Sequence, residues 1–203
     1  VDVAADEERL EVLVDRRPHD ERALREGRAP PADEAGLGRL DLHDFDLDDL
    51  IDEGSLVEYG RFAVAAQRGR REMQDLIEKT PADGIIGGTA RINGELFDDE
   101  TAACAVLSYD YTVMAGTQGA VGHLKKDRLF ELIERMELPT VFFAEGGGGR
   151  PGDTDFPVVS ALHVRAFALW AALSGVVPRI AIVSGRCFAG NAAILGCCDL
   201  IVA

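Results

Sequence analysis

Residues 51–203 of the sequence predict an α/β domain whose sheet is mostly buried. Short apolar runs rich in Val, Ile and Phe alternate with longer segments in which apolar residues recur at helical spacing. Glycine-rich turns join the two kinds of segment, and 17 of the 22 glycines follow residue 60. The apolar runs carry little charge, which is typical of strands that are covered on both faces.

The first 50 residues differ from this body and are predicted to form an acidic, partly helical arm or linker. Residues 1–60 carry 19 acidic and 7 basic side chains, whereas residues 61–203 carry 17 and 14. Pro and Gly interrupt the segment, and Glu8–Val14 is its best helical turn. Residues 41–53 place Leu, Phe and Ile among carboxylates, which fits either a docked amphipathic segment or a solvated acidic helix.

The first half of the body is predicted as a helix, two strands and a second helix. Apolar residues at helical spacing from residue 61 predict a helix that ends before Thr80-Pro81. Residues 82–92 then predict a strand with a glycine interruption, and residues 103–111 predict a second strand. Residues 119–137 return to helical spacing behind a glycine-rich entrance, so a long helix is expected there.

The second half of the body continues the alternation of strand and helix. Residues 140–144 predict a strand, and after a glycine-rich loop a long apolar helix is expected over residues 158–174. A strand over residues 179–184 follows, then a turn and a short helix over residues 191–196. The final strand is expected over residues 199–203.

Charge and composition exclude several classes of function. A net charge of −15 argues against broad electrostatic binding to nucleic acid or anionic lipid. No apolar run is long enough for a membrane span, and the first residues resemble no secretory signal. The 4 cysteines lack metal-ligand spacing, so we expect no metal and small buried thiols in a reducing compartment. That compartment would be the cytoplasm, or the mitochondrial matrix in a eukaryote.

The first of two glycine-rich turns formally matches a dinucleotide-binding fingerprint. It reads GGGRPG over residues 147–152 and follows a strand. Pro151 and the polar run behind it delay the helix, and no acidic residue closes a second strand, so a Rossmann site is not expected. The glycines fit either a flexible loop or the close approach of bare N–H groups to an anion.

The second turn, over residues 185–191, lies between a strand and a helix. The N–H groups of Ala189 and Gly190 would begin that helix, where free donors and the helix dipole favour negative charge. Two such turns after neighbouring strands could together form an oxyanion hole. His123 has no recognisable triad or metal partner, and we expect it on a solvated face.

The chain resembles the carboxyltransferase component of biotin-dependent acyl-CoA carboxylases in three ordered blocks. They are SYDYTVMAGTQG at 108–119, FFAEGGGGRPGDTD at 142–155 and LSGVVPRIAIVSGRCFAGNAAILGCCDLIVA at 173–203. The weaker stretch TPADGIIGGTARING precedes them in the family's order. The resemblance is to the propionyl-CoA and long-chain acyl-CoA type and covers about residues 50–203. It implies a crotonase-like spiral of ββα units.

The resemblance also implies an activity. A carboxyl group would pass from carboxybiotin, held on a separate carrier, to the α-carbon of an acyl-CoA through an enolate. The backbone N–H groups of Ala189 and Gly190 would bind the enolate oxygen, with Gly148 and Gly149 as the facing wall. Family members carry Gly-Gly where this chain has Ala189-Gly190. Four residues are candidates for contacts with the acyl-CoA: Gly147, Arg150, Lys125 and Arg186.

The partners that the resemblance implies are a biotin carboxylase, a biotin carboxyl carrier and a second carboxyltransferase half that holds the biotin pocket. Assembly into a dimer-based or hexameric homo-oligomer is expected. Because the chain stops after an apolar strand that should be covered, we expect it to be a fragment. Two alternatives stay open: another crotonase-fold CoA-thioester enzyme (a decarboxylase, hydrolase or isomerase), and a non-catalytic assembly subunit that docks through its acidic arm.

Overall fold

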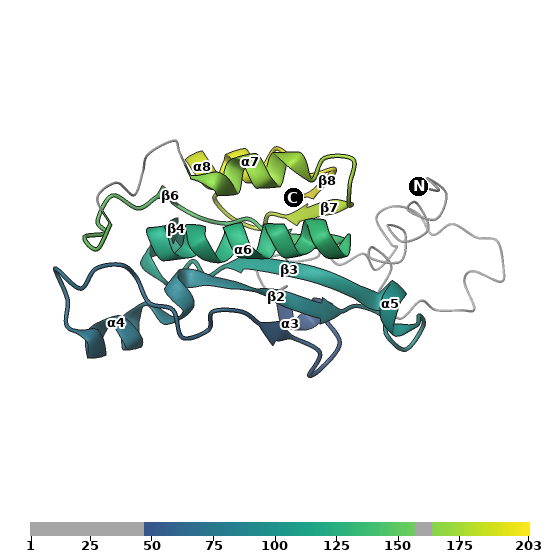
Figure 1. The fold of residues 1–203 in the computed structure, drawn as a ribbon, viewed down its shortest axis with the longest axis horizontal. Coiled ribbons are helices and arrows are strands. Elements are labelled where there is room, and N and C mark those ends of the chain that lie inside the picture. The colour runs from purple at the N-terminus through teal and green to yellow at the C-terminus, as the bar shows by residue number, and fades with distance from the viewer. Residues whose placement is uncertain (1–46, 157–163) are drawn as a thin grey trace, which may run out of the picture. The chain divides into compact units, whose positions relative to one another are not determined.

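The computed structural model describes residues 47–156 and 164–203, so the expected helical turn at Glu8–Val14 lies outside the described residues. Six strands form one sheet in the order β1-β2-β3-β5-β7-β8 (Figure 1). Their bounds are Val57–Glu58, Ile85–Arg91, Ala103–Tyr109, Thr140–Phe143, Arg179–Ile182 and Leu200–Val202. Strands β1, β2 and β3 pair antiparallel, whereas β3, β5, β7 and β8 pair parallel.

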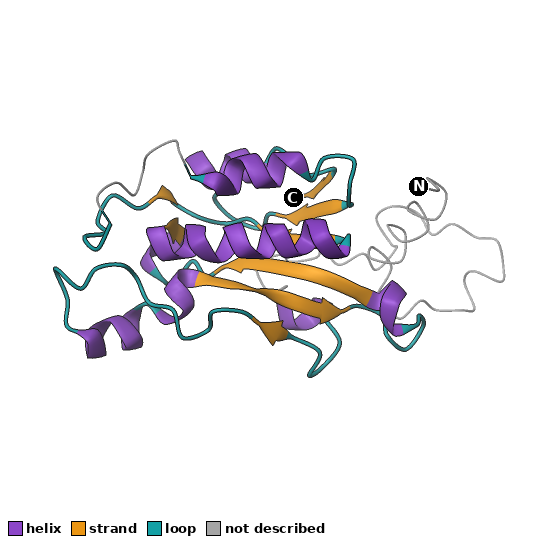
Figure 2. Ribbon diagram, in the orientation of Figure 1, coloured by secondary structure: helices purple, strands orange, loops and turns teal. Residues whose placement is uncertain are grey.

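Helices supply the crossovers that parallel strands need. Helix α6 links β3 to β5, α7 links β5 to β7, and α8 links β7 to β8 (Figure 2). The described helices are α3 Leu47–Leu50, α4 Met73–Lys79, α5 Asp99–Ala102, α6 Ala120–Met136, α7 Arg165–Ala172 and α8 Ala189–Leu195. Two short 3-10 turns, η1 Pro81–Gly84 and η2 Met114–Gly116, complete the set.

The main core lies between the sheet and these three crossover helices. Its largest side chains are fully buried and come from strands and helices alike: Ile85, Leu107, Phe142, Phe130, Ile133, Trp170 and Ile194. The Trp170 ring packs against Phe130 at 4.7 Å between ring centroids, and its Nε1 donates to the Ile194 carbonyl at 2.9 Å. Helices α6, α7 and α8 are therefore fixed to one another as well as to the sheet.

A smaller layer crosses the ends of the parallel strands. Strand β4, Thr117–Gln118, pairs parallel with β6, Gly148–Gly149, and Gly146 forms an isolated parallel bridge with Cys187. Strand β4 follows β3, Gly146 and β6 follow β5, and Cys187 follows β7. Three turns that are far apart in the sequence thus meet at the carboxyl ends of three neighbouring strands, where open α/β sheets commonly bind ligands.

Most of the predicted elements are confirmed. The expected strands over 103–111, 140–144, 179–184 and 199–203 contain β3, β5, β7 and β8. The helix expected over 119–137 is α6. Helix α8 begins two residues before the expected residue 191. Helix α7 occupies part of the segment 158–174, whose residues 158–163 lie outside the described ranges.

Two predictions around the first strand pair are wrong. Residues 61–72 are not helical, because this segment is held by contacts to distant residues: Ala65 N donates to Thr80 Oγ1 at 3.0 Å. The glycines of β2 do not interrupt the strand either. A Cβ on Gly88 would lie 2.1 Å from the Val57 carbonyl oxygen, so glycine lets β1 pair closely there.

The described residues can be compared with what the sequence predicts for the cysteines, membrane spans and metal sites. All four cysteines are free, but only Cys104 is buried and Cys197 is exposed, so the expectation that all are buried is wrong. No described helix combines the length and apolarity needed to cross a membrane. Within residues 47–156 and 164–203, no cluster of three His, Cys, Asp or Glu side chains could hold a metal ion.

Candidate active site

The glycine run after β5 is packed closely against its neighbours. Gly146 N donates to the Arg186 carbonyl at 2.9 Å, and Phe188 N donates back to the Gly146 carbonyl at 3.0 Å. A Cβ on Gly146 would lie 2.0 Å from Asn191 Nδ2. Gly148 has φ of +83°, and a Cβ there would lie 2.8 Å from the Ala189 Cβ. Glycine is required at both positions because neighbouring atoms approach closely, and at Gly148 also because of its positive φ.

The start of α8 faces this run. Phe188 is the N-cap residue, and its carbonyl accepts from Asn191 N at 3.0 Å. The N–H groups of Ala189 and Gly190 donate to no acceptor among the described residues. Ala189 is exposed and has φ of +47°, a left-handed conformation that alanine rarely adopts. Two free donors therefore lie beside Gly148, the residue that the sequence placed opposite them.

A buried polar network lies beneath the start of α8. Gln118 Nε2 donates to Asn191 Oδ1 at 2.8 Å, and Asn191 Nδ2 donates to the Gly116 carbonyl at 3.4 Å. Lys126 Nζ donates to Gln118 Oε1 and, at 2.9 Å, to the Tyr109 hydroxyl. Burial lowers the pKa of Lys126 to about 7. The network connects β3, β4, α6 and α8, and it orients the turn that carries the two free amides.

Two side chains of the neighbouring turns are the nearest candidates for acid or base chemistry. Glu145 Oε1 accepts from Ser184 N and, at 2.7 Å, from Ser184 Oγ, so the carboxylate joins the ends of β5 and β7. Burial and the Glu145 charge raise the pKa of the Cys187 thiol to about 11. The thiol is therefore protonated near neutral pH and is a poor nucleophile.

Arg150 and Lys125, both expected to contact acyl-CoA, use their charged groups within this chain. Arg150 is 2% exposed, forms an ion pair with Asp83 and donates from Nη2 to the Thr117 carbonyl at 2.8 Å. Burial raises the pKa of Asp83, although the Arg150 guanidinium acts in the opposite direction. Lys125 Nζ donates to the Ala82 carbonyl at 2.9 Å and also to the Ile85 carbonyl.

The remaining predicted site residues lie on or near the surface. Arg186, Gly147 and Gly149 are exposed, and a Cβ on Gly149 would meet nothing within 4 Å. The structure thus brings Gly148, Ala189 and Gly190 together, whereas Lys125 lies on α6 against η1. The expectation that His123 is solvated is wrong: it is 7% exposed and its ring packs against Phe167.

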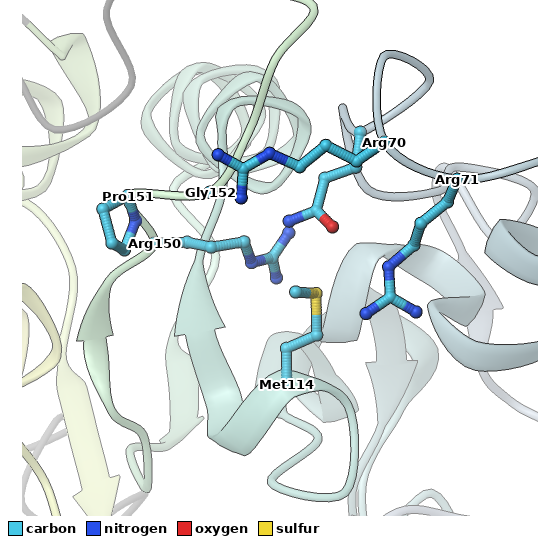
Figure 3. A pocket seen from close by; sticks show the side chains of 7 residues that line it. Arg70, Arg71, Met114, Arg150, Pro151 and Gly152 are labelled. Atoms are coloured by element: carbon cyan, nitrogen blue, oxygen red, sulfur yellow. The ribbon is translucent and has the colours of Figure 1, made fainter.

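A cavity of about 560 Å³ lies next to the glycine run. Residues 67–71 form one wall, and residues 150–152, directly after β6, form another. Figure 3 shows Arg70, Arg71 and Arg150 extending into the same space, with Met114 at one side. A Cβ on Gly152 would lie 3.5 Å from Arg70 Nη1, which shows that the Arg70 guanidinium reaches across to the other wall.

Sequence reasoning missed Lys126, Gln118, Asn191 and the arginines of residues 67–71. One signal was present, because Lys126 shares helical spacing with Leu129, Phe130 and Ile133 and therefore lies on the buried face of α6. Residues 67–71 gave no such signal, since their position next to the glycine run depends on hydrogen bonds to residues 153–155.

Comparison with known proteins adds to this geometry. A family model described as the carboxyl transferase domain matches residues 46–203. The chain is 30% identical over 183 residues to the propionyl-CoA carboxylase beta chain of Roseobacter denitrificans, covering 89% of this chain and 32% of that relative. It is 31% identical over 155 residues to the biotin-dependent long chain acyl-coenzyme A carboxylase beta4 subunit of Mycobacterium tuberculosis, covering 76% and 26%.

Solved structures agree with the sequence relatives. A single-chain, multi-domain long-chain acyl-CoA carboxylase matches with 46% identity and a TM-score of 0.71, over 96% of this chain and 18% of that one. The transcarboxylase 12S hexamer with hydrolyzed methylmalonyl-coenzyme A bound matches with 28% identity and a TM-score of 0.58, over 76% of this chain and 28% of that one. The chain spans less than a third of the length of each of these four proteins.

These structures confirm the crotonase-like fold that the family resemblance implies. The family match begins at residue 46, one residue before α3, and continues to the last strand of the sheet. The chain belongs to the carboxyl transferase domain family.

Proposed function

We propose that this chain forms the CoA-thioester side of the active site of a biotin-dependent acyl-CoA carboxylase. The carboxyl group would move from carboxybiotin to the α-carbon of an acyl-CoA. One observation carries the proposal: the free N–H groups of Ala189 and Gly190 lie beside Gly148, at the carboxyl ends of parallel strands. The family match, and relatives named as propionyl-CoA and long chain acyl-CoA carboxylase subunits, support it.

The chain's own contribution would be to stabilise charge on the substrate. When the α-proton of the thioester leaves, negative charge develops on the carbonyl oxygen, and two fixed N–H donors stabilise that charge without reorganising. Each such donor is worth roughly 3–4 kcal/mol. Gly148, which has no side chain, lets Ala189 pack directly against it. The network of Asn191, Gln118 and Lys126 would hold the donors in place.

The described side chains fit a reaction in which the base is brought by the cofactor. Glu145 accepts hydrogen bonds from Ser184, and the Cys187 thiol, with its pKa raised to about 11, is protonated at neutral pH. Carboxybiotin, when bound, supplies the carboxyl group and, after releasing it, the base. Residues of this chain would therefore position the thioester, and we assign the biotin pocket to a second carboxyltransferase half.

We also infer the partners from the family. Biotin carboxylase and a biotin carboxyl carrier would supply the carboxyl group, and the hexameric assembly named for transcarboxylase 12S supports a homo-oligomer. Residues 1–50 would act as an acidic arm ahead of the catalytic domain at 51–203. We place the enzyme in the cytoplasm, or in the mitochondrial matrix in a eukaryote.

An assay of the complete protein tests the activity. It combines the protein with biotin carboxylase, biotinylated carrier, ATP, bicarbonate and a series of acyl-CoA thioesters, and mass spectrometry detects the product. We expect a thioester that is one CO2 heavier. If no thioester gains CO2 while the carrier is carboxylated, the proposed function is wrong.

The variant Gly148→Ala tests the site itself. Its new Cβ would collide with the Ala189 Cβ, so we expect kcat to fall about 100-fold, the loss typical of a damaged oxyanion hole. Gly175→Ala is a matched control, because Gly175 has φ of +73° but open space around a Cβ. Equal activity of the two variants would rule out a role for the contact between Gly148 and Ala189.

A further inference from the structure

We propose that the cavity between residues 67–71 and residues 150–152 binds phosphate groups of the CoA moiety, with Arg70 as the main ligand. The inference rests on the proposed function for its choice of ligand. It differs from the sequence expectation, which placed the acyl-CoA contacts on Gly147, Arg150, Lys125 and Arg186.

The charges around the cavity leave one cation without a counterion. Arg150 pairs with Asp83 and lies 3.7 Å from Asp153, and Arg71 pairs with Asp75 at 3.1 Å. Among the described residues, no carboxylate pairs with Arg70. Its guanidinium nevertheless extends into the space that Arg71 and Arg150 also enter (Figure 3). Arg70 is exposed and its charge is not neutralised by a described carboxylate, so a bound anion would supply a counterion for it.

The two walls of the cavity are fixed to each other. Five hydrogen bonds of 2.7–3.2 Å join the segment before α4 to the segment after β6. They are Gln67 Nε2 to Asp153 Oδ1, Arg68 N to Asp155 Oδ1, Gly69 N to Thr154 Oγ1, Thr154 N to Ala66 O and Asp155 N to Ala66 O. Because the walls are held in advance, a ligand need not order them when it binds.

The lining suits the phosphate end of a nucleotide-like ligand. Arginine's planar guanidinium recognises phosphate oxygens with paired hydrogen bonds. Met114 and Pro151 add apolar surface next to the arginines. A volume of about 560 Å³ lies within the range of small-molecule sites, which is roughly 300–1,000 Å³.

The position of the cavity favours CoA over an unrelated anion. Gly152 lies four residues after Gly148, so its Cα is within about 14 Å of the Cα of Gly148. An elongated ligand could therefore place a thioester beside Gly148 and a phosphate beside Arg70. An acyl-CoA has reactive and phosphorylated ends of this kind.

Four thioesters with the same acyl group test the proposal in the complete protein: CoA, dephospho-CoA, phosphopantetheine and pantetheine. We expect Arg70→Gln to raise KM for the CoA thioester about tenfold, the effect of losing a charge-assisted hydrogen bond, with little change in kcat. KM for the pantetheine thioester, which has no phosphate, should not change. Arg70→Lys keeps the charge but loses the paired hydrogen bonds, so it should restore only part of the affinity. Arg135→Gln, an equal charge change at the far end of α6, should behave like the wild type.

The series also shows which phosphate binds. If the effect of Arg70→Gln disappears with dephospho-CoA, the 3′-phosphate is the ligand, and if it persists there, the diphosphate is. An equal KM change for the CoA and pantetheine thioesters, or no change for either, overturns the proposal. Calorimetry with CoA alone separates the phosphate-binding proposal from the proposed carboxyltransferase function. If Arg70→Gln weakens CoA binding, the phosphate-binding proposal is supported even if no thioester is carboxylated. If Arg70→Gln leaves CoA binding unchanged, the phosphate-binding proposal is overturned.

Discussion

Ala189 occupies a left-handed backbone conformation, with φ of +47°, at the start of α8. An L side chain in this region costs about 1 kcal/mol or more, and glycine avoids that strain. Backbone strain of this kind often occurs at functional sites. At Ala189 it accompanies the close contact with Gly148.

Ala189→Gly should therefore raise the free energy of unfolding by about 0.5–1 kcal/mol. The control is Ala193→Gly, an exposed position in the same helix with ordinary helical geometry, which should lose about 1 kcal/mol. Urea denaturation measures both. If the two variants lose stability equally, the strain at Ala189 is not real.

Lys126 is a cation with no exposed surface, and its position predicts a pH effect. Among the described residues, its Nζ donates to the neutral Gln118 and Tyr109, with Asp83, Asp127 and the neutral His123 nearby. Burial lowers the pKa of Lys126 from 10.5 to about 7, so between these values the unfolded chain binds the extra proton. Stability should therefore rise with pH above 7.

Lys126→Met should remove that rise. From pH 7 to 8 the wild type should gain about 1 kcal/mol relative to the variant, measured by urea denaturation at each pH. This window lies below the ordinary pKa of cysteine, so the buried thiols contribute little to the comparison. Parallel stability curves for the two proteins would show that Lys126 does not titrate in this range.

At the scale of elements, the ion pair of Asp83 and Arg150 joins η1, α6 and the segment after β6. Its side chains are 0% and 3% exposed, and Asp83 Oδ2 also accepts from Gly122 N at 2.7 Å. Asp83→Asn keeps the shape and tolerates the left-handed φ of +53°, but leaves Arg150 without its main counterion.

Such a change should lower the free energy of unfolding by about 3 kcal/mol, as expected for a broken buried pair. Asp99→Asn, which breaks the exposed pair with Arg91, should cost less than about 1 kcal/mol. Thermal or urea unfolding of both variants checks the difference. Similar losses would mean that the buried pair does not hold these elements together.

The elements that could be predicted from sequence are those whose order depends on local periodicity. Leu129, Ile133 and their neighbours mark α6 to within one residue at each end, because its apolar face repeats with the helical period. Residues 61–72 could not be predicted, because Ala65 and Gln67 are buried by contacts to Thr80 and Asp153, which lie far along the chain.

The residues of the candidate site also form two groups, those that could be predicted from the sequence and those that could not. Glycine-rich turns after strands indicate bare backbone donors, so Ala189 and Gly190 could be named in advance, whereas Gly148 and Gly149 follow only from the family resemblance. The structure places Gly148 against Ala189, but Gly149 is exposed. Their catalytic role is still a prediction. The position of Arg70 depends on tertiary contacts, and neither spacing nor composition distinguishes it from a surface cation, whereas the helical spacing of Lys126 with Leu129 and Ile133 indicates its burial.

At the scale of the whole molecule, β8 lies at an edge of the six-stranded sheet. Leu200, Ile201 and Val202 are 37%, 45% and 37% exposed. Exposed apolar edge strands promote association. We expect these 203 residues, produced alone, to self-associate in light scattering, and Ile201→Lys to reduce it. A monodisperse monomer would contradict this expectation.

A structure of the complete protein with an acyl-CoA bound would show where the thioester binds. We expect the thioester oxygen to lie about 2.7–3.1 Å from the amide nitrogens of Ala189 and Gly190, opposite Gly148. A thioester bound elsewhere, or one whose oxygen is held by side chains instead of these amides, would contradict this prediction.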